Sequence, residues 1–179
     1  MRELSLHILD IVNNSIKADS TLIEIGIEED DKINKLTIII KDNGKGMDDE
    51  LLKKVNDPFT TSRTTRTVGL GIPLFKNAAL LCGGSFDIKS KPDVGTIVTA
   101  SFVLNHIDRQ PLGDMSSTLL TMITANSDIV FVYHHVVNGK GFILNTQQIK
   151  ERLGNVPITT PEVVLWLKDY IQEGLTNII

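Results

Sequence analysis

Two glycine-containing segments carry residue types that could hold an anionic ligand. The first follows an apolar, β-branched run over residues 36–41 and reads Asp42-Asn43-Gly44-Lys45-Gly46-Met47. A carboxylate at a strand end, followed by two glycines, suits a backbone that bends sharply and admits a ligand. The second segment, Val68-Gly69-Leu70-Gly71, leads into a helical run, and unpaired N–H groups before a helix suit phosphate oxygens. Either segment alone is also typical of a hairpin turn or an ordinary loop.

A polar stripe on the first predicted helix supplies a second group of candidates. Asp10, Asn14 and Lys17 lie at positions i, i+4 and i+7, so they share one helix face. A carboxylate, a carboxamide and an ammonium group in line could hold a water, a hard metal ion and a phosphate. The alternative is a solvated face whose charged pairs only stabilise the helix.

Residues 60–67 form a run of Thr, Ser and Arg without apolar periodicity. Arg63 and Arg66 come just before the second glycine segment, where an anionic ligand would need countercharge. We therefore expect a mobile lid that an anionic ligand would order, with a plain surface loop as the alternative.

The elements that must position these residues follow from hydrophobic periodicity. The pattern predicts helices over residues 3–17, 48–55 and 72–81, and strands over residues 20–28, 36–41, 85–90 and 96–104. This order predicts an α/β sandwich with a mixed sheet. Beyond residue 104 we expect a helix at 116–126, a hairpin from 128 to 144, and helices at 146–153 and 160–175. Residues 1–104 are thus the predicted domain, and residues 105–179 a smaller α/β C-terminal extension.

Composition limits the class of protein. The chain has 179 residues, 41% of them hydrophobic, and a formal charge of −4, which does not indicate a nucleic-acid binder. The single cysteine, Cys82, excludes an intramolecular disulfide and fits a reducing compartment. No apolar run reaches membrane-spanning length, so we expect a soluble, cytoplasmic protein. His134 and His135 are adjacent in a predicted strand and must point to opposite faces, which argues against a paired metal site.

Five short motifs occur in a recognisable order. They are Asp10-x-x-x-Asn14-Ser15-Ile16-Lys17-Ala18, Asp42-x-Gly44-x-Gly46-Met47, Pro58-Phe59-x-Thr61, Gly69-Leu70-Gly71-Ile72 and Gly95-Thr96. Together they resemble the ATP-binding domain shared by gyrase, gyrase-type heat-shock chaperones, histidine kinases and mismatch-repair ATPases, the GHKL superfamily. The resemblance covers residues 3–104. It implies a Bergerat fold, in which a pocket lies between a mixed sheet and helices on one face.

The resemblance also implies ATP and Mg²⁺ as cofactors. By that analogy Asn14 coordinates the Mg²⁺ that bridges the phosphates, and Asp42 accepts a hydrogen bond from the adenine amino group. Thr96 would support Asp42 through a bridging water. The remaining residues that the resemblance places at the nucleotide are Lys17, Gly44, Gly46, Met47, Thr61, Arg66, Gly69, Leu70 and Gly71.

The departures from the family pattern concern catalysis. Asp10 stands where the gyrase and chaperone branches carry a Glu that activates water, and Asp is one methylene shorter. We therefore expect slow hydrolysis, with Asp10 receiving a proton from a docked partner hydroxyl. In the lid, Ser62 replaces the usual lysine and Arg63 follows it.

Three functions fit the motifs and the chain length. The first is a regulatory protein kinase of the anti-sigma type, because only two residues precede the first helix and residues 105–179 are short for a transducer domain. The second is a nucleotide-gated interaction protein with little catalysis. The third is a catalytic module that phosphorylates a histidine on a separate chain. Each requires an unidentified protein partner, and the sequence also allows a homodimer.

Overall fold

The computed structural model describes residues 2–56 and 70–179. The predicted lid at residues 60–67 lies outside the described residues, as do the predicted ATP contacts Thr61, Arg66 and Gly69.

Within the described residues the strands form one mixed sheet of six strands in the order β3-β4-β2-β1-β5-β6. The strands are β1 (Leu22–Asp30), β2 (Lys35–Asp42), β3 (Ser85–Lys91), β4 (Gly95–Val103), β5 (Val130–Val137) and β6 (Lys140–Asn145). All neighbours pair antiparallel except β1 and β5, which are parallel. The predicted mixed sheet is confirmed.

The helices are α1 (Leu4–Lys17), α2 (Asp49–Asn56), α3 (Gly71–Leu81), α4 (Met115–Ala125), α5 (Thr146–Leu153) and α6 (Pro161–Thr176). Each helix and strand boundary falls within two residues of its prediction. The Asp48 carboxylate accepts the Leu51 N–H at 2.8 Å and caps α2, because an N-cap oxygen satisfies a first-turn donor.

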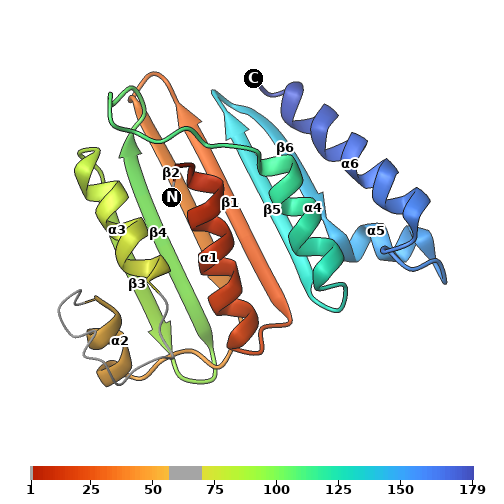
Figure 1. Cartoon of the computed structure of the whole chain (residues 1–179), viewed down its shortest axis with the longest axis horizontal. Coiled ribbons are helices and arrows are strands. Elements are labelled where there is room, and N and C mark those ends of the chain that lie inside the picture. Colours follow the sequence, from red (N-terminus) through yellow and green to blue (C-terminus); the bar gives the residue numbers. More distant parts are fainter. Residues whose placement is uncertain (1, 57–69) are drawn as a thin grey trace.

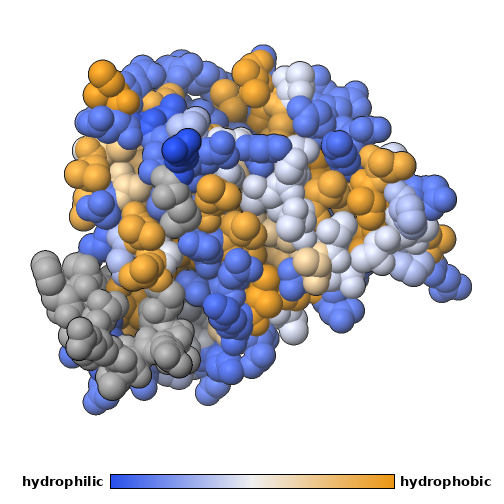
Figure 2. Space-filling view, in the orientation of Figure 1, coloured by the Kyte–Doolittle hydropathy of each residue, from blue (hydrophilic) through white to orange (hydrophobic). Residues whose placement is uncertain are grey.

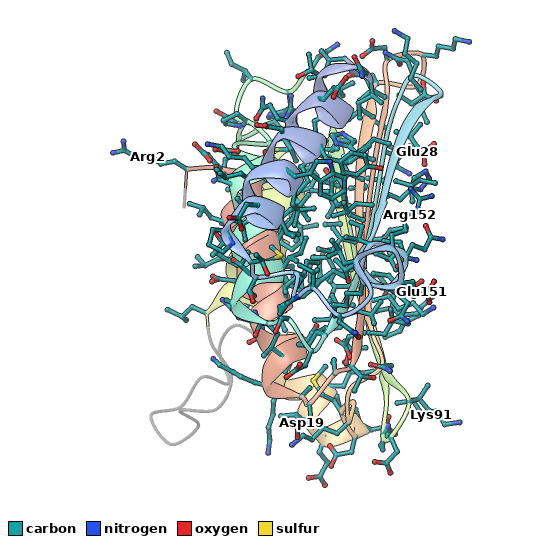
Figure 3. All side chains as sticks on the ribbon, turned by 90° about the vertical axis from the view of Figure 1, so that its right-hand side faces the viewer. Arg2, Asp19, Glu28, Lys91, Glu151 and Arg152 are labelled. Atoms are coloured by element: carbon teal, nitrogen blue, oxygen red, sulfur yellow. The ribbon has the colours of Figure 1, made fainter. Side chains whose placement is uncertain are left out.

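The helices α1, α3 and α4 lie over one face of the sheet (Figure 1), and the edge-on view in Figure 3 shows them on the same side. The alternation in β1 explains this arrangement, since Ile23, Ile25 and Ile27 are buried toward the helices. On the open face Glu24 forms an ion pair with Lys41 of β2 at 2.8 Å. This two-layer arrangement is the α/β sandwich expected from the sequence.

The C-terminal extension continues the same sheet. β5 pairs with β1 from Leu22 opposite Val130 to Glu29 opposite Val137. The segment before α4 also meets α1, because the Leu4 and Ser5 N–H groups donate to the Pro111 and Leu112 carbonyls at 2.9 and 2.8 Å. The extension therefore shares a core with the first 104 residues, while a domain boundary at residue 104 stays a prediction.

Three residues singled out in the sequence have clear surroundings. His134 is exposed and His135 is buried, so the two rings point to opposite faces as expected. Cys82 is buried, and burial raises the pKa of its thiol. In the described part of the chain, no helix has the length and apolar character needed to cross a membrane.

Candidate functional site

A cavity of about 590 Å³ opens between α1, α2, the start of α3 and the ends of β2 and β4. This volume is within the range of small-molecule sites. Its lining comprises Ile11, Asn14, Ser15, Lys17, Ala18, Asp42, Lys45, Gly46, Met47, Leu51, Val55, Ile72, Thr96 and Val98. The predicted residues Asn14, Lys17, Asp42, Gly46, Met47 and Thr96 are thus brought together around one cavity.

Asp42 is held rigidly at the cavity wall by three donors from its own chain. Its Oδ1 accepts the N–H groups of Gly44 at 2.9 Å and Thr96 at 3.3 Å. Its Oδ2 accepts the Ser15 hydroxyl at 2.6 Å. An ionised carboxylate has about four acceptor positions, so one remains for a donor inside the cavity.

Ser15 was not assigned a role from the sequence, although it makes the shortest of these bonds. One signal could have found it, because Ser15 continues the buried stripe of α1 that contains Leu4, Ile8 and Ile11. A hydroxyl on an apolar helix face needs a polar partner, and Asp42 is that partner.

Ser90 is the second residue that sequence reasoning missed. Its hydroxyl oxygen accepts the Met47 N–H at 2.8 Å, lies 2.8 Å from the Thr96 hydroxyl, and is 3.0 Å from the Gly95 carbonyl. Ser90 therefore ties the loop after β2 to the start of β4, which fixes Met47 beside Thr96. The Thr96 hydroxyl is bonded to Ser90 and its N–H to Asp42, so Thr96 already supports Asp42 directly.

The two glycines after Asp42 are required by close packing of the chain on itself. Gly46 has a φ of +64°, and a methyl group there would lie 2.0 Å from the Lys91 carbonyl oxygen. Gly44 is buried, and a methyl group there would lie 2.7 Å from the Ala18 carbonyl oxygen. Gly46 lines the cavity whereas Gly44 packs behind it, and a contact of either with a base stays a prediction.

The predicted polar stripe of α1 divides between two surroundings. Asn14 is half-buried in the cavity wall, and Lys17 is exposed at its rim. Asp10 instead lies against the first residue of α3, because a methyl group at Gly71 would be 2.9 Å from Asp10 Cβ and 3.3 Å from its carboxylate. A carboxylate near a helix N-terminus is favoured by the helix dipole. Leu70, the residue before α3, is 66% exposed.

The donor set fits the magnesium ion that the sequence suggests. Asn14 offers an amide oxygen at the cavity, and Mg²⁺ in nucleotide sites takes one or two protein oxygens, phosphate oxygens and waters. Among the described residues, no cluster of three or more His, Cys, Asp or Glu could hold a metal by itself. Phosphate oxygens and waters would complete the coordination of such an ion.

The rim of the cavity is basic. Lys17 and Lys45 both line it, and Lys45 pairs with Asp19 at 2.8 Å, with both side chains largely exposed. Asp19 and Lys91 mark the end of the molecule where this rim lies (Figure 3). The cavity thus combines an apolar interior, one anchored carboxylate and a cationic rim, which suits a flat heterocycle bearing an anionic tail.

Comparison with known proteins agrees with this geometry. Residues 2–106 match the family described as histidine kinase-, DNA gyrase B- and HSP90-like ATPase. The chain is 28% identical over 97 residues to the sensor histidine kinase YvrG of Bacillus subtilis (strain 168), covering 52% of this chain and 17% of that protein. It is 35% identical over 94 residues to sporulation kinase D of the same organism, covering 51% of this chain and 18% of that protein. The matched part is therefore less than a fifth of these relatives.

Solved structures show the same fold. The Aquifex aeolicus MutL ATPase domain complexed with ADP superposes with a TM-score of 0.55 at 16% identity, covering 84% of this chain and 68% of that chain. The N-terminal domain of a DNA repair protein gives a TM-score of 0.54 at 16% identity, covering 81% of this chain and 53% of that chain. The protein belongs to the histidine kinase-, DNA gyrase B- and HSP90-like (GHKL) ATPase family, as the sequence motifs indicated.

Proposed function

We propose that this chain binds Mg-ATP in the cavity beside α1, with the adenine amino group donating to Asp42. The observation that carries the proposal is the Asp42 carboxylate, which three donors hold at the cavity wall with one acceptor position free. An acceptor-only group selects an amino group over a carbonyl.

The phosphates would extend toward the rim, where Lys17 supplies positive charge and Asn14 an amide oxygen for Mg²⁺. The start of α3 would present N–H groups to the phosphates, since a helix N-terminus favours anions. With Mg²⁺ bound, the ion would neutralise phosphate charge and orient the γ-phosphate.

The activity that we propose is that of a regulatory protein kinase of the anti-sigma type. Asp10 lies beside Gly71, one turn of α1 before Asn14, so its carboxylate is near the expected position of the phosphates. A general base must come within hydrogen-bond reach of the proton that it accepts, directly or through one water. In this role Asp10 takes the proton from a partner's hydroxyl as that oxygen attacks the γ-phosphorus and ADP leaves.

A second candidate is favoured by the relative YvrG, which is a sensor histidine kinase by name. In that case the chain would phosphorylate a histidine of another protein. His7 is an unsuitable acceptor because it is 2% exposed, stacks on Phe75 and hydrogen-bonds Gln110. A nucleotide-gated interaction protein without transfer is the third alternative.

Transfer of radiolabel from γ-labelled ATP to a co-purified protein tests the choice among these activities. An acid-stable product supports the hydroxyl kinase, an acid-labile product supports the histidine kinase, and binding without transfer supports the gated protein. Asp10→Asn should abolish transfer to a hydroxyl while leaving ATP affinity nearly unchanged.

The metal assignment has its own test. Asn14→Ala should remove the dependence of ATP affinity on Mg²⁺, measured by calorimetry with and without the ion, while weaker nucleotide binding remains. Asn13→Ala is the matched control, because Asn13 is the exposed neighbour and does not line the cavity. If Mg²⁺ strengthens ATP binding equally in both variants, the ion is held elsewhere.

A further inference from the structure

The C-terminal edge of the sheet presents an unpaired strand beside a second cavity. β6 is the last strand in the sheet order, and among the described residues only β5 pairs with it. Such an edge is a template for another strand.

The outward-facing groups of β6 follow from its hairpin. Asn138 and Gly139 form a two-residue turn with φ values of 50° and 87°, and Val137 pairs with Lys140 across it. In such a hairpin the pair flanking the turn is hydrogen-bonded, and bonded and non-bonded pairs alternate along the strands. Gly141 and Ile143 therefore direct their N–H and C=O groups away from β5.

The second cavity, of about 270 Å³, lies beyond this edge. One wall is Ile143, on the open face of the sheet, because its neighbours Phe142 and Leu144 are buried under the helices. The opposite wall is Trp166 and Tyr170 of α6, on the helix face. The α5 residues Gln148, Ile149, Arg152 and Leu153 also line the cavity, so it adjoins the edge of β6 to which a seventh strand would add.

The walls suit alternating apolar side chains. Trp166 and Tyr170 stack with ring centroids 5.2 Å apart, yet remain 49% and 38% exposed, and Ile143 is 61% exposed. Hydrophobic residues reach the surface along α6 (Figure 2). Successive side chains of an added strand would fall alternately on the aromatic pair and on the Ile143 side.

The charge of the cavity indicates what kind of strand it fits. Arg152 of α5 is the one charged residue in the lining, and it forms no ion pair with the described residues. Figure 3 faces this edge of the molecule, where Arg152 is labelled. In a chain of net charge −4, an unpaired guanidinium beside an apolar edge favours a carboxylate from outside.

We propose that β6 and this cavity bind an extended segment of a partner protein in which apolar residues alternate along the strand and an acidic residue pairs with Arg152. The segment adds to the sheet by backbone hydrogen bonds with Gly141 and Ile143. A second copy of this chain is a poorer occupant, since a symmetric contact would put the same basic groove on both sides.

The test begins with a phage-displayed library of random peptides selected on the purified full chain. Enriched peptides should contain Asp or Glu among alternating apolar residues. Fluorescence anisotropy should show at least a tenfold loss of affinity for Arg152→Glu. Lys89→Glu, the same charge reversal on the opposite edge strand β3, should leave affinity unchanged.

A second measurement uses the unaltered protein, so it does not depend on a variant folding. N-methylation of single peptide bonds in a selected peptide should weaken binding at least tenfold at alternate positions and leave the intervening positions unchanged. This period of two is specific to strand addition.

Three results would overturn the proposal. They are a selection without any binder, binding that survives Arg152→Glu, and N-methyl effects without alternation. A dimer in sedimentation that Arg152→Glu dissociates, with no peptide selected, would assign the surface to a second copy instead.

Discussion

Replacing Asp42 by Asn tests the centre of the candidate site with a minimal change of shape. The Asn side-chain oxygen can keep the N–H bonds from Gly44 and Thr96, now made at 2.9 and 3.3 Å. Its amino group would then replace Oδ2, and the Ser15 hydroxyl, 2.6 Å away, can turn to accept from it. The fold should therefore survive the substitution.

The affinity for ATP, in contrast to the fold, should be weakened by Asp42→Asn. The Asn amino group would meet the adenine amino group donor to donor, leaving a buried donor without a partner. Such a group costs about 1–3 kcal/mol. At about 1.4 kcal/mol per tenfold change, ATP affinity should fall by roughly 5- to 150-fold. Inosine triphosphate has a carbonyl at that position, so the substitution should lower the affinity for it much less than the affinity for ATP, or should raise it.

Calorimetry with both nucleotides measures this change of specificity. Asp87→Asn is a matched control, since it alters an exposed carboxylate on β3 outside the cavity, and its affinities should equal those of the parent protein. If Asp42→Asn folds and binds ATP as tightly as the parent, Asp42 does not hold the base.

Two further predictions concern stability. Asp114 caps α4 by accepting the Ser117 N–H at 2.9 Å and hydroxyl at 2.6 Å, so Asp114→Ala should lower the free energy of unfolding by about 1 kcal/mol in urea titrations. The hydrogen bonds from Ser117 lower the pKa of Asp114. The stabilisation by this cap is therefore complete above the ordinary carboxyl pKa and should be lost as pH falls through the lowered pKa of Asp114. Burial beside Phe75 lowers the pKa of His7 below its usual value of 6.5. As pH falls below 6.5 the unfolded chain takes up this proton more readily than the folded protein does, so the stability of the fold should decline. The melting temperature of His7→Gln should therefore fall less between pH 7 and pH 5 than that of the parent protein. An equal fall in both proteins would show that His7 does not cause this pH dependence.

The sequence predicted the elements well because their signals are local. The alternation of Ile23, Ile25 and Ile27 marks β1, and Asn138-Gly139 marks the hairpin turn. The order of the strands has no such signal. That β5 would pair with β1 depends on which apolar faces meet, and many arrangements bury the same residues.

The contacts within the site were harder to predict than its members. Asp42 and Ser15 are 27 residues apart, and their bond depends on how α1 is rotated over the sheet. Ser90 lies in a strand among other polar residues, so its type alone did not distinguish it. Asp10 and Gly71 fall in two separate motifs, and only the crossing of α1 and α3 brings them together.

Helix α1 links the candidate site to the C-terminal extension. The first N–H groups of a helix lack partners within it, and the residue before α1, Glu3, makes no side-chain cap. The carbonyls of Pro111 and Leu112 accept the Leu4 and Ser5 N–H groups instead. These carbonyls lie beyond residue 106, where the family match ends. Because α1 also carries Asn14 in the cavity wall, a segment outside the family match contacts the helix that forms part of this wall.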